Sequence, residues 1–324
     1  MSTLAFIGCG AMGAPIAERL IDAGHTVRVF DPRAAAMAPL VARGGIAATS
    51  PRDAATGAET AFACLPSPEV SREAAFGEDG VAGVKGLRTY VEMSTIGSKT
   101  IKTIAAELAK HNIAVLDSPV SGGPRGARAG TLSTMVAGER TAFERVKPLF
   151  DAVARNVFYV GDKPGLAQVT KLANNMISAA GMVASFEAAA MAVKAGVDAR
   201  TFIDTVNAST GRNTATSDKF PASILTRSFD YGGKVGTMYK DVFLCLEEAR
   251  QLNVPMWLGN NVVQMWFHAM TEGRGDDDYT SLIQMIERWA GVVVGGNESG
   301  LSPSSPPAKA GDPVNTGGAV KPRT

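Results

Sequence analysis

Three glycines near the N-terminus, set between two apolar runs, constrain the fold of this chain more than any other feature. Residues 3–7 predict a buried strand, Gly8-Cys9-Gly10-Ala11-Met12-Gly13 follows, and the apolar spacing over 14–23 predicts a helix. A second strand over 26–30 ends at Asp31. Strand, glycine turn, helix, strand and terminal acid stand in the order that a dinucleotide-binding βαβ unit requires. The alternative, a glycine-rich turn that serves only for packing, would not explain the acidic residue at the end of the second strand.

Each glycine has its own role in such a unit. Gly8 permits the tight turn, Gly10 lets the backbone approach a pyrophosphate, and Gly13 lets the helix pack closely on the strand. The free N–H groups at the helix start then face the phosphates. Asp31 follows at close to the expected interval of about 20 residues and would bind the ribose hydroxyls. Its charge favours NAD because it repels a 2′-phosphate, while the nearby Arg33 leaves NADP as the alternative.

Composition and charge exclude several functional classes. The net charge of the 324-residue chain is +1, so we expect neither nucleic acid nor an anionic membrane as a partner. Cys9, Cys64 and Cys245 are scattered, which predicts no metal site and suits a reducing, cytoplasmic compartment. The N-terminus lacks the basic start of a secretory signal. No apolar stretch approaches the roughly 20 residues that span a bilayer, so we expect no membrane segment.

Strand and helix signals alternate up to about Gly161, and beyond it only helical runs remain. We predict an α/β Rossmann-type N-terminal domain over 1–162 and an all-α C-terminal domain over 163–294, which opens with a long interdomain helix. Half of residues 295–324 are Gly, Pro or Ser, which predicts a disordered tail. Further strands are expected at 61–65, 89–93, 113–116, 133–137 and 157–160. Helices of the second domain are expected at 164–194, 199–208, 235–252, 256–270 and 279–290.

The long helix over 164–194 carries a polar cluster near its start. Lys171, Asn174 and Asn175 are three and four residues apart, so they project from one face. An ammonium beside two carboxamides could hold a substrate and move a proton. The alternative is a solvated lysine with asparagines that face water. The same helix is apolar on several sides, which predicts burial against a second copy, in a homodimer or a homotetramer.

Taken together, these motifs resemble the β-hydroxyacid dehydrogenases, which include 3-hydroxyisobutyrate dehydrogenase and tartronate semialdehyde reductase. The resemblance runs from about Leu4 to Ala290 and lies in both domains. It rests on the fingerprint over 6–13 and on the matches Leu65-Pro66, Ser94-Thr95, Asp117-Ser118-Pro119-Val120-Ser121-Gly122-Gly123, Gly130-Thr131-Leu132, Lys171 with its asparagines, and Lys240-Asp241.

The resemblance implies a role for each matched residue. Leu65, Pro66, Thr95 and Lys240 would contact the cofactor, together with Gly8, Cys9, Gly10, Ala11, Met12, Gly13 and Asp31. Ser121, Gly122 and Gly123 would present a hydroxyl and N–H groups to the substrate carboxylate, with Asn174 in the same shell. Lys171 would be the general acid/base, oriented by Asn175. Burial in a closed cleft should lower the lysine pKa from about 10.4 towards neutrality.

The implied activity is the NAD-dependent interconversion of a small β-hydroxy acid and its semialdehyde. Alternatives are an NADPH-dependent reductase of tartronate or succinic semialdehyde, a non-catalytic dinucleotide-binding module, and an imine reductase, whose relatives generally lack a lysine at this place. Arg19, Cys64 and a short loop at Pro66 depart from the family pattern at the edges of the cofactor pocket. The segment 209–233 is unlike the best-known members, and we expect it to shape the substrate pocket through Arg212, Asn213, Thr214, Lys219, Phe220, Arg227 and Tyr231.

Overall fold

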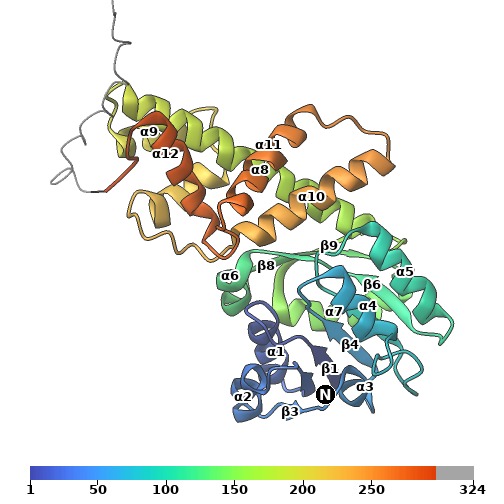
Figure 1. Cartoon of the computed structure of the whole chain (residues 1–324). Coiled ribbons are helices and arrows are strands. Elements are labelled where there is room, and N and C mark those ends of the chain that lie inside the picture. The colour runs from blue at the N-terminus through green and yellow to red at the C-terminus, as the bar shows by residue number, and fades with distance from the viewer. Residues whose placement is uncertain (297–324) are drawn as a thin grey trace, which may run out of the picture.

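A parallel α/β sheet followed by a bundle of helices makes up the computed structural model, which describes residues 1–296 (Figure 1). The sheet occupies residues 3–161 and the helices occupy 166–290. The predicted fold class, a Rossmann-type domain followed by an all-helical one, is therefore confirmed. The tail predicted for 295–324 lies outside the described residues, apart from Gly295 and Gly296.

The sheet has nine strands in the order β3-β2-β1-β4-β5-β6-β8-β7, with β9 paired to β8. Neighbours from β3 to β6 run parallel, β8 is antiparallel to both β6 and β7, and β9 is parallel to β8. The chain reverses its winding between β1 and β4, and ligands bind at the carboxyl ends of the strands at such a point. The strands are β1 Thr3–Ile7, β2 Thr26–Phe30, β3 Ile46–Ala47, β4 Thr60–Ala63, β5 Thr89–Glu92, β6 Ala114–Asp117, β7 Val120–Ser121, β8 Leu132–Ala137 and β9 Ala154–Gly161.

Apolar side chains on both faces of the sheet explain why its strands are almost continuously hydrophobic. In β1, Leu4 and Phe6 enter one core while Ala5 and Ile7 enter the other, as the two-residue period of a strand requires. The first core includes residues of α1 and α7, and the second includes residues of α3, α4 and α5. The helices are α1 Gly13–Asp22, α2 Ala34–Ala42, α3 Pro51–Ala55, α4 Pro68–Phe76, α5 Ser98–Ala109, α6 Gly123–Ala129 and α7 Arg140–Val153.

The helical part is organised around α8, Leu166–Lys194, a helix of 29 residues. It packs against α10, α11 and α12, and its Phe186 shares a core with Phe220 and Trp266. By length and apolarity alone α8 could cross a membrane, so the prediction that no stretch reaches that length was wrong. Half of the relevant window is buried inside the protein, which is the behaviour of a core helix. The other elements are α9 Ala199–Asn207, a π-helix Ala215–Ile224, α10 Val235–Gln251, α11 Trp257–Thr271, a 3₁₀-helix Tyr279–Leu282 and α12 Ile283–Ala290.

Three helices were not predicted from the sequence. Helix α4 begins directly after the Pro66-Ser67-Pro68 loop, with Ser67 as its N-cap, whose hydroxyl accepts the Val70 N–H at 3.3 Å, and Pro68 at its first position. Helix α6 lies within a glycine- and arginine-rich stretch, whose glycine content is unusual for a helix. The π-helix Ala215–Ile224 includes a proline, which masked its helical character.

Candidate active site

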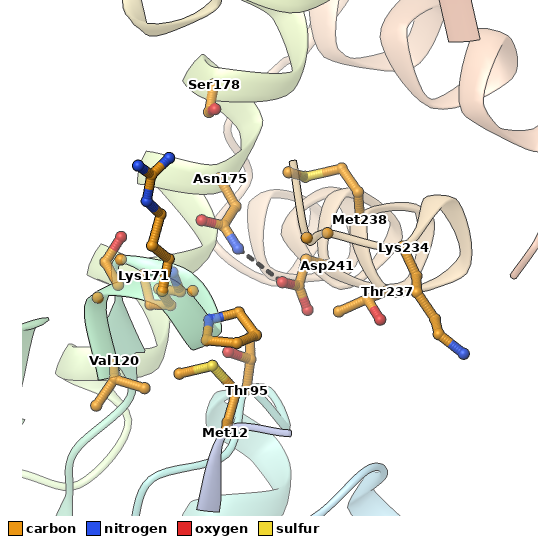
Figure 2. A pocket seen from close by; sticks show the side chains of 18 of the residues that line it. Met12, Thr95, Val120, Lys171, Asn175, Ser178, Lys234, Thr237, Met238 and Asp241 are labelled. Carbon is orange, nitrogen blue, oxygen red and sulfur yellow. Dashed lines mark hydrogen bonds between the residues drawn. The ribbon is translucent and has the colours of Figure 1, made fainter. Parts of the chain in front are cut away.

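A cleft of about 760 Å³ lies between the carboxyl edge of the sheet and the helical part of the protein. The loops after β1, β4, β5 and β7 form one side, and α8, α10 and the π-helix form the other. Figure 2 shows Asn175 of α8 pointing to Asp241 of α10, with Lys171 farther along α8 and with Met12 and Thr95 of the sheet loops nearby.

The structure brings most of the predicted site residues to this cleft. Those that line it are Met12, Leu65, Pro66, Thr95, Ser121, Gly122, Gly123, Lys171, Asn174, Asn175 and Lys240. The others belong to the glycine turn and the end of β2, outside the lining of the cleft, and they are Gly8, Cys9, Gly10, Ala11, Gly13 and Asp31. The two groups are joined through Met12, so an extended dinucleotide could run from the turn into the cleft.

The glycine turn has the close approaches that a phosphate cradle needs. Gly8 has a φ of +95°, and a Cβ there would lie 2.3 Å from the carbonyl oxygen of Cys64. A Cβ on Gly13 would lie 1.9 Å from the carbonyl oxygen of Gly8. Over Gly10 the nearest atom to such a Cβ is Arg33 Nη2 at 3.9 Å, so the backbone is open to a ligand there. The turn therefore fits the pyrophosphate of a dinucleotide.

Asp31 is held at the end of β2 by two neighbours. Its Oδ2 accepts the backbone N–H of Cys9 at 3.0 Å, and its Oδ1 accepts Nε of Arg33 at 3.0 Å. Burial works against ionisation, but these hydrogen bonds outweigh it and hold the pKa of Asp31 below its usual range. Burial together with the charge of Asp31 raises the pKa of the Cys9 thiol to about 12, so Cys9 is an uncharged packing residue.

Lys171 is 7% exposed and lies on the wall of the cleft. Within residues 1–296 its Nζ takes part in no hydrogen bond or ion pair. Burial lowers the pKa of Lys171 to about 8; the charge of Asp241 opposes this shift and that of Lys240 adds to it. An amine with this pKa can both accept and donate a proton near neutral pH.

The polar groups around Lys171 form a chain across α8 and α10. Asn175 donates from Nδ2 to Oδ2 of Asp241 at 2.6 Å, and Asn174 donates to Oδ1 of Asn175 at 3.2 Å. Lys240 donates to the carbonyl oxygen of Thr95. Its Nζ also lies 2.9 Å from Oδ1 of Asp241, at an angle that makes no hydrogen bond, so this oxygen accepts none from residues 1–296. Asp241 was noted only as part of the Lys240-Asp241 match, and its position makes it a member of the site.

Gln168 and Asp117 fix the start of α8 against the sheet. Oδ2 of Asp117 accepts the N–H groups of Gly165 at 2.9 Å and Gln168 at 3.1 Å, so the carboxylate caps the helix. The amide of Gln168 donates to Oδ1 of Asp117 at 2.7 Å and to the carbonyl oxygen of Ser94 at 3.0 Å. Burial raises the pKa of Asp117 to about 6. Gln168 was missed from the sequence, and Asp117 anchors the helix, outside the lining of the cleft.

A second buried carboxyl, Glu92, supports the loops after β4 and β5. It accepts the backbone N–H of Ser94 at 3.0 Å and also the Ser94 hydroxyl. The Ser94 oxygen in turn accepts the N–H of Leu65 at 2.7 Å. Complete burial raises the pKa of Glu92 to about 7. Leu65 and the adjoining Thr95 loop are thereby held together at the switch point of the sheet.

The segment 209–233 contributes only part of what was expected to the cleft. Thr214, Lys219 and Tyr231 line it, while Arg212, Asn213, Phe220 and Arg227 do not. Phe220 is in the helical core, and Arg227 is paired with Glu287. Among residues 1–296, no three or more His, Cys, Asp or Glu side chains are grouped as metal ligands.

Comparisons with known proteins agree with this arrangement. Residues 3–161 match the family model described as the NAD-binding domain of 6-phosphogluconate dehydrogenase, and 165–286 match that of NADP-dependent 3-hydroxyisobutyrate dehydrogenase. A 3-hydroxyisobutyrate dehydrogenase of Pseudomonas aeruginosa is 35% identical, over 89% of this chain and 99% of its own. An NAD-dependent L-serine dehydrogenase of the same organism is 35% identical, over 88% and 98%. The solved Mycobacterium tuberculosis 3-hydroxyisobutyrate dehydrogenase with L-serine is similar at a TM-score of 0.79 and 28% identity, over 88% of this chain and 99% of that one.

Proposed function

Because this chain belongs to the β-hydroxyacid dehydrogenase family of NAD(P)-dependent oxidoreductases, we propose that it interconverts a small β-hydroxy acid and its semialdehyde with NAD, as a 3-hydroxyisobutyrate dehydrogenase does. The observation that carries the proposal is the unpaired amine of Lys171, with its pKa near 8, in a cleft that continues from a dinucleotide turn. We also propose that the boundary between the Rossmann-type domain and the helical domain lies between residues 162 and 163.

The cofactor would be held by the glycine turn and by the loops that meet it. The turn from Gly8 to Gly13 would take the pyrophosphate, and Asp31 would take the ribose hydroxyls. Leu65, Pro66, Thr95 and Lys240 would surround the other end, in the cleft. When bound, the nicotinamide supplies the chemistry of hydride exchange. The open backbone over Gly10 supports this placement.

The substrate would be oriented by its carboxylate. Ser121, Gly122 and Gly123 offer a hydroxyl and N–H groups on the sheet side of the cleft, and Asn174 offers a carboxamide opposite. The β-hydroxyl would then point to Nζ of Lys171, which accepts its proton in oxidation and returns one in reduction. Asn175, fixed by its bond to Asp241, would hold the hydroxyl or the amine in line.

Two features bear on the cofactor and on assembly. Asp31 supports NAD, and one of the relatives is named as NAD-dependent, whereas the exposed Arg33 beside it supports NADPH-dependent reduction of a semialdehyde as the second candidate.

Ile177 and Met191 remain 74% and 71% exposed on α8, which supports a homodimer or homotetramer packed along it. The free cysteines suit a cytoplasmic enzyme.

The proposal is tested by absorbance at the nicotinamide band, with a panel of β-hydroxy acids and semialdehydes and each cofactor. We expect turnover with at least one acid, and a Lys171→Ala variant whose kcat is lower by about 10²–10⁴ while cofactor binding persists. Normal turnover by Lys171→Ala would show that the amine has no role in the proton step. The absence of any cofactor reduction across the panel would favour a non-catalytic binding module.

A further inference from the structure

Lys219 is a buried lysine in the cleft that the proposed reaction does not use. It lies on the π-helix Ala215–Ile224, a rare kind of element that is frequently found at functional sites. The residue is only 4% exposed, yet it is part of the wall of the same cleft as Lys171. In the proposed reaction Ser121 binds the carboxylate of the β-hydroxy acid and Lys171 contacts its hydroxyl, so Lys219 has no assigned role.

The surroundings of Lys219 contain no anion in contact with it. Its Nζ reaches Thr214 Oγ1 at 3.2 Å and the Thr214 carbonyl oxygen at 3.4 Å, and it stands 5.4 Å and 5.8 Å from the ring centres of Tyr231 and Tyr279. No ion pair joins it to a carboxylate in the part of the chain that the structure describes; Asp218, its chain neighbour, acts on it from a distance. A buried ammonium is unfavourable unless an anion or good acceptors reach it.

Apart from Lys171, which the proposed reaction uses, the other lysines on the wall of the cleft already have a carboxylate beside them. Lys234 pairs with Asp276 at 2.8 Å, and Lys240 lies 2.9 Å from Asp241 while it donates to Thr95. Lys219 therefore offers an ammonium without a carboxylate in contact with it, which a carboxylate bound in the cleft can neutralise. Tyr231 and Tyr279, whose ring centres are 5.9 Å apart, give that part of the wall an aromatic lining suited to a short chain of methylene groups.

We propose that Lys219 binds a second carboxylate of the substrate, so that the preferred substrates are β-hydroxy acids with a carboxylate on their side chain. This inference rests on the proposed function for the placement of the first carboxylate and the hydroxyl. The ammonium of Lys219 matches one singly charged carboxylate. Tyr231 and Tyr279 pack against the carbons between the two carboxylates.

The first test compares two substrates that differ in one charge. 2-(Hydroxymethyl)glutarate carries the second carboxylate on a two-carbon arm, and its distal monoamide has nearly the same shape without the charge. We expect kcat/KM of the wild-type enzyme to favour the diacid by about 10- to 100-fold, the effect of one charge-assisted hydrogen bond. Equal kcat/KM for the two compounds would overturn the inference.

The second test removes the charge of the lysine. In Lys219→Met the ratio of the two kcat/KM values should fall to about one, because Met keeps the length of the side chain without its ammonium. Lys234→Met, which removes a cleft lysine that already has a carboxylate partner, should keep the wild-type ratio. A Lys219→Met enzyme that still prefers the diacid, or a Lys234→Met enzyme that loses the preference, would contradict the assignment.

A binding measurement separates this inference from the proposed reaction. 2-Methylglutarate lacks the hydroxyl and cannot be oxidised, so calorimetric titration into the NAD-loaded wild-type enzyme reports the two-carboxylate site alone. It should bind about 10- to 100-fold tighter than its distal monoamide. That result without turnover of any β-hydroxy acid would retain the Lys219 site and reject the reaction. Equal binding of the two probes would reject the Lys219 site, whatever the turnover.

Discussion

Two substitutions on α10 should move the pKa of Lys171 in opposite directions. The Asp241 charge raises this pKa and the Lys240 charge lowers it, around a value of about 8. Asp241→Asn removes the carboxylate that favours the ammonium, yet its amide oxygen can still accept the hydrogen bond from Asn175. Lys240→Met removes the like charge that disfavours the ammonium. We expect the first change to lower the Lys171 pKa and the second to raise it, by about one unit each.

The size of the effect on the rate follows from the neutral fraction of the amine. With a pKa of about 8, roughly one Lys171 side chain in ten is neutral at pH 7, against about one in 3,000 for an unperturbed lysine. Burial in the cleft thus increases the supply of the base about 300-fold. A further shift of about one unit changes the oxidation rate about tenfold at a pH well below both the original and the shifted pKa.

Initial rates of oxidation and reduction between about pH 6 and pH 10 measure this shift. In the wild-type enzyme, log kcat/KM for oxidation should rise with pH up to about 8 and then level off, because the neutral amine is the base. For reduction it should be level at low pH and fall above about 8, since the ammonium is the acid. The inflection should move down in Asp241→Asn, move up in Lys240→Met, and stay in place in Lys234→Met.

The pH of the inflection reports the pKa of Lys171 independently of the overall rate. The overall rate of Lys240→Met will also fall, because this variant loses the contact with Thr95. Movement of the inflection in the same direction in both α10 variants would refute the electrostatic argument. An oxidation rate that decreases as the pH rises towards 8 would refute the assignment of Lys171 as the base.

Two further predictions concern the support of the site. Asp31→Asn should lower the ratio of kcat/KM for NAD to kcat/KM for NADP by about 10- to 100-fold. The substitution removes a charge-assisted hydrogen bond to the ribose and releases Arg33, which can then bind a 2′-phosphate. An unchanged ratio would exclude Asp31 from cofactor selection. Glu92 has its folded-state pKa raised from 4.5 to about 7, so its stabilisation is present below pH 4.5 and is lost as the pH rises through about 7. We therefore expect the free energy of unfolding of the wild-type protein, measured by urea titration relative to that of Glu92→Gln, to fall by about 3 kcal/mol between pH 4.5 and pH 8. If the free energies of unfolding of the two proteins change in parallel with pH, the Glu92 carboxyl is not desolvated.

The parts of the fold that the sequence predicts well are those set by local patterns. The β1 strand, the glycine turn and the terminal Asp31 follow from residue type and spacing, which act within one βαβ unit. Helix α4 could also have been predicted, because Ser67 and Pro68 are an N-cap and a first-turn proline. The second proline of the Pro66-Ser67-Pro68 segment starts this helix.

Contacts between elements that are distant in the sequence could not be read from local patterns. Gln168 is one polar residue on an apolar helix, and its partners Ser94 and Asp117 are 74 and 51 residues away. Lys219 stood in a segment whose role in the pocket was expected, but its burial depends on Tyr231 and Tyr279, which pack beside the π-helix only in the folded chain. Sequence spacing shows which residues share an element and gives no information on which distant element they meet.

The position of the Lys171 amine is set by contacts made one turn earlier on its helix. Gln168 and Lys171 are three residues apart, so they lie on the same side of α8. Gln168 accepts the N–H groups of Ile96 and Gly97 at 2.8 Å and 3.0 Å and donates to Asp117, which fastens the first turn to the loops after β5 and β6. The loop after β5 includes Thr95, which lies in the wall of the cleft. Because buried bonds of Gln168 hold the helix, Nζ of Lys171 needs no partner to keep it in place, and it stays free to exchange a proton.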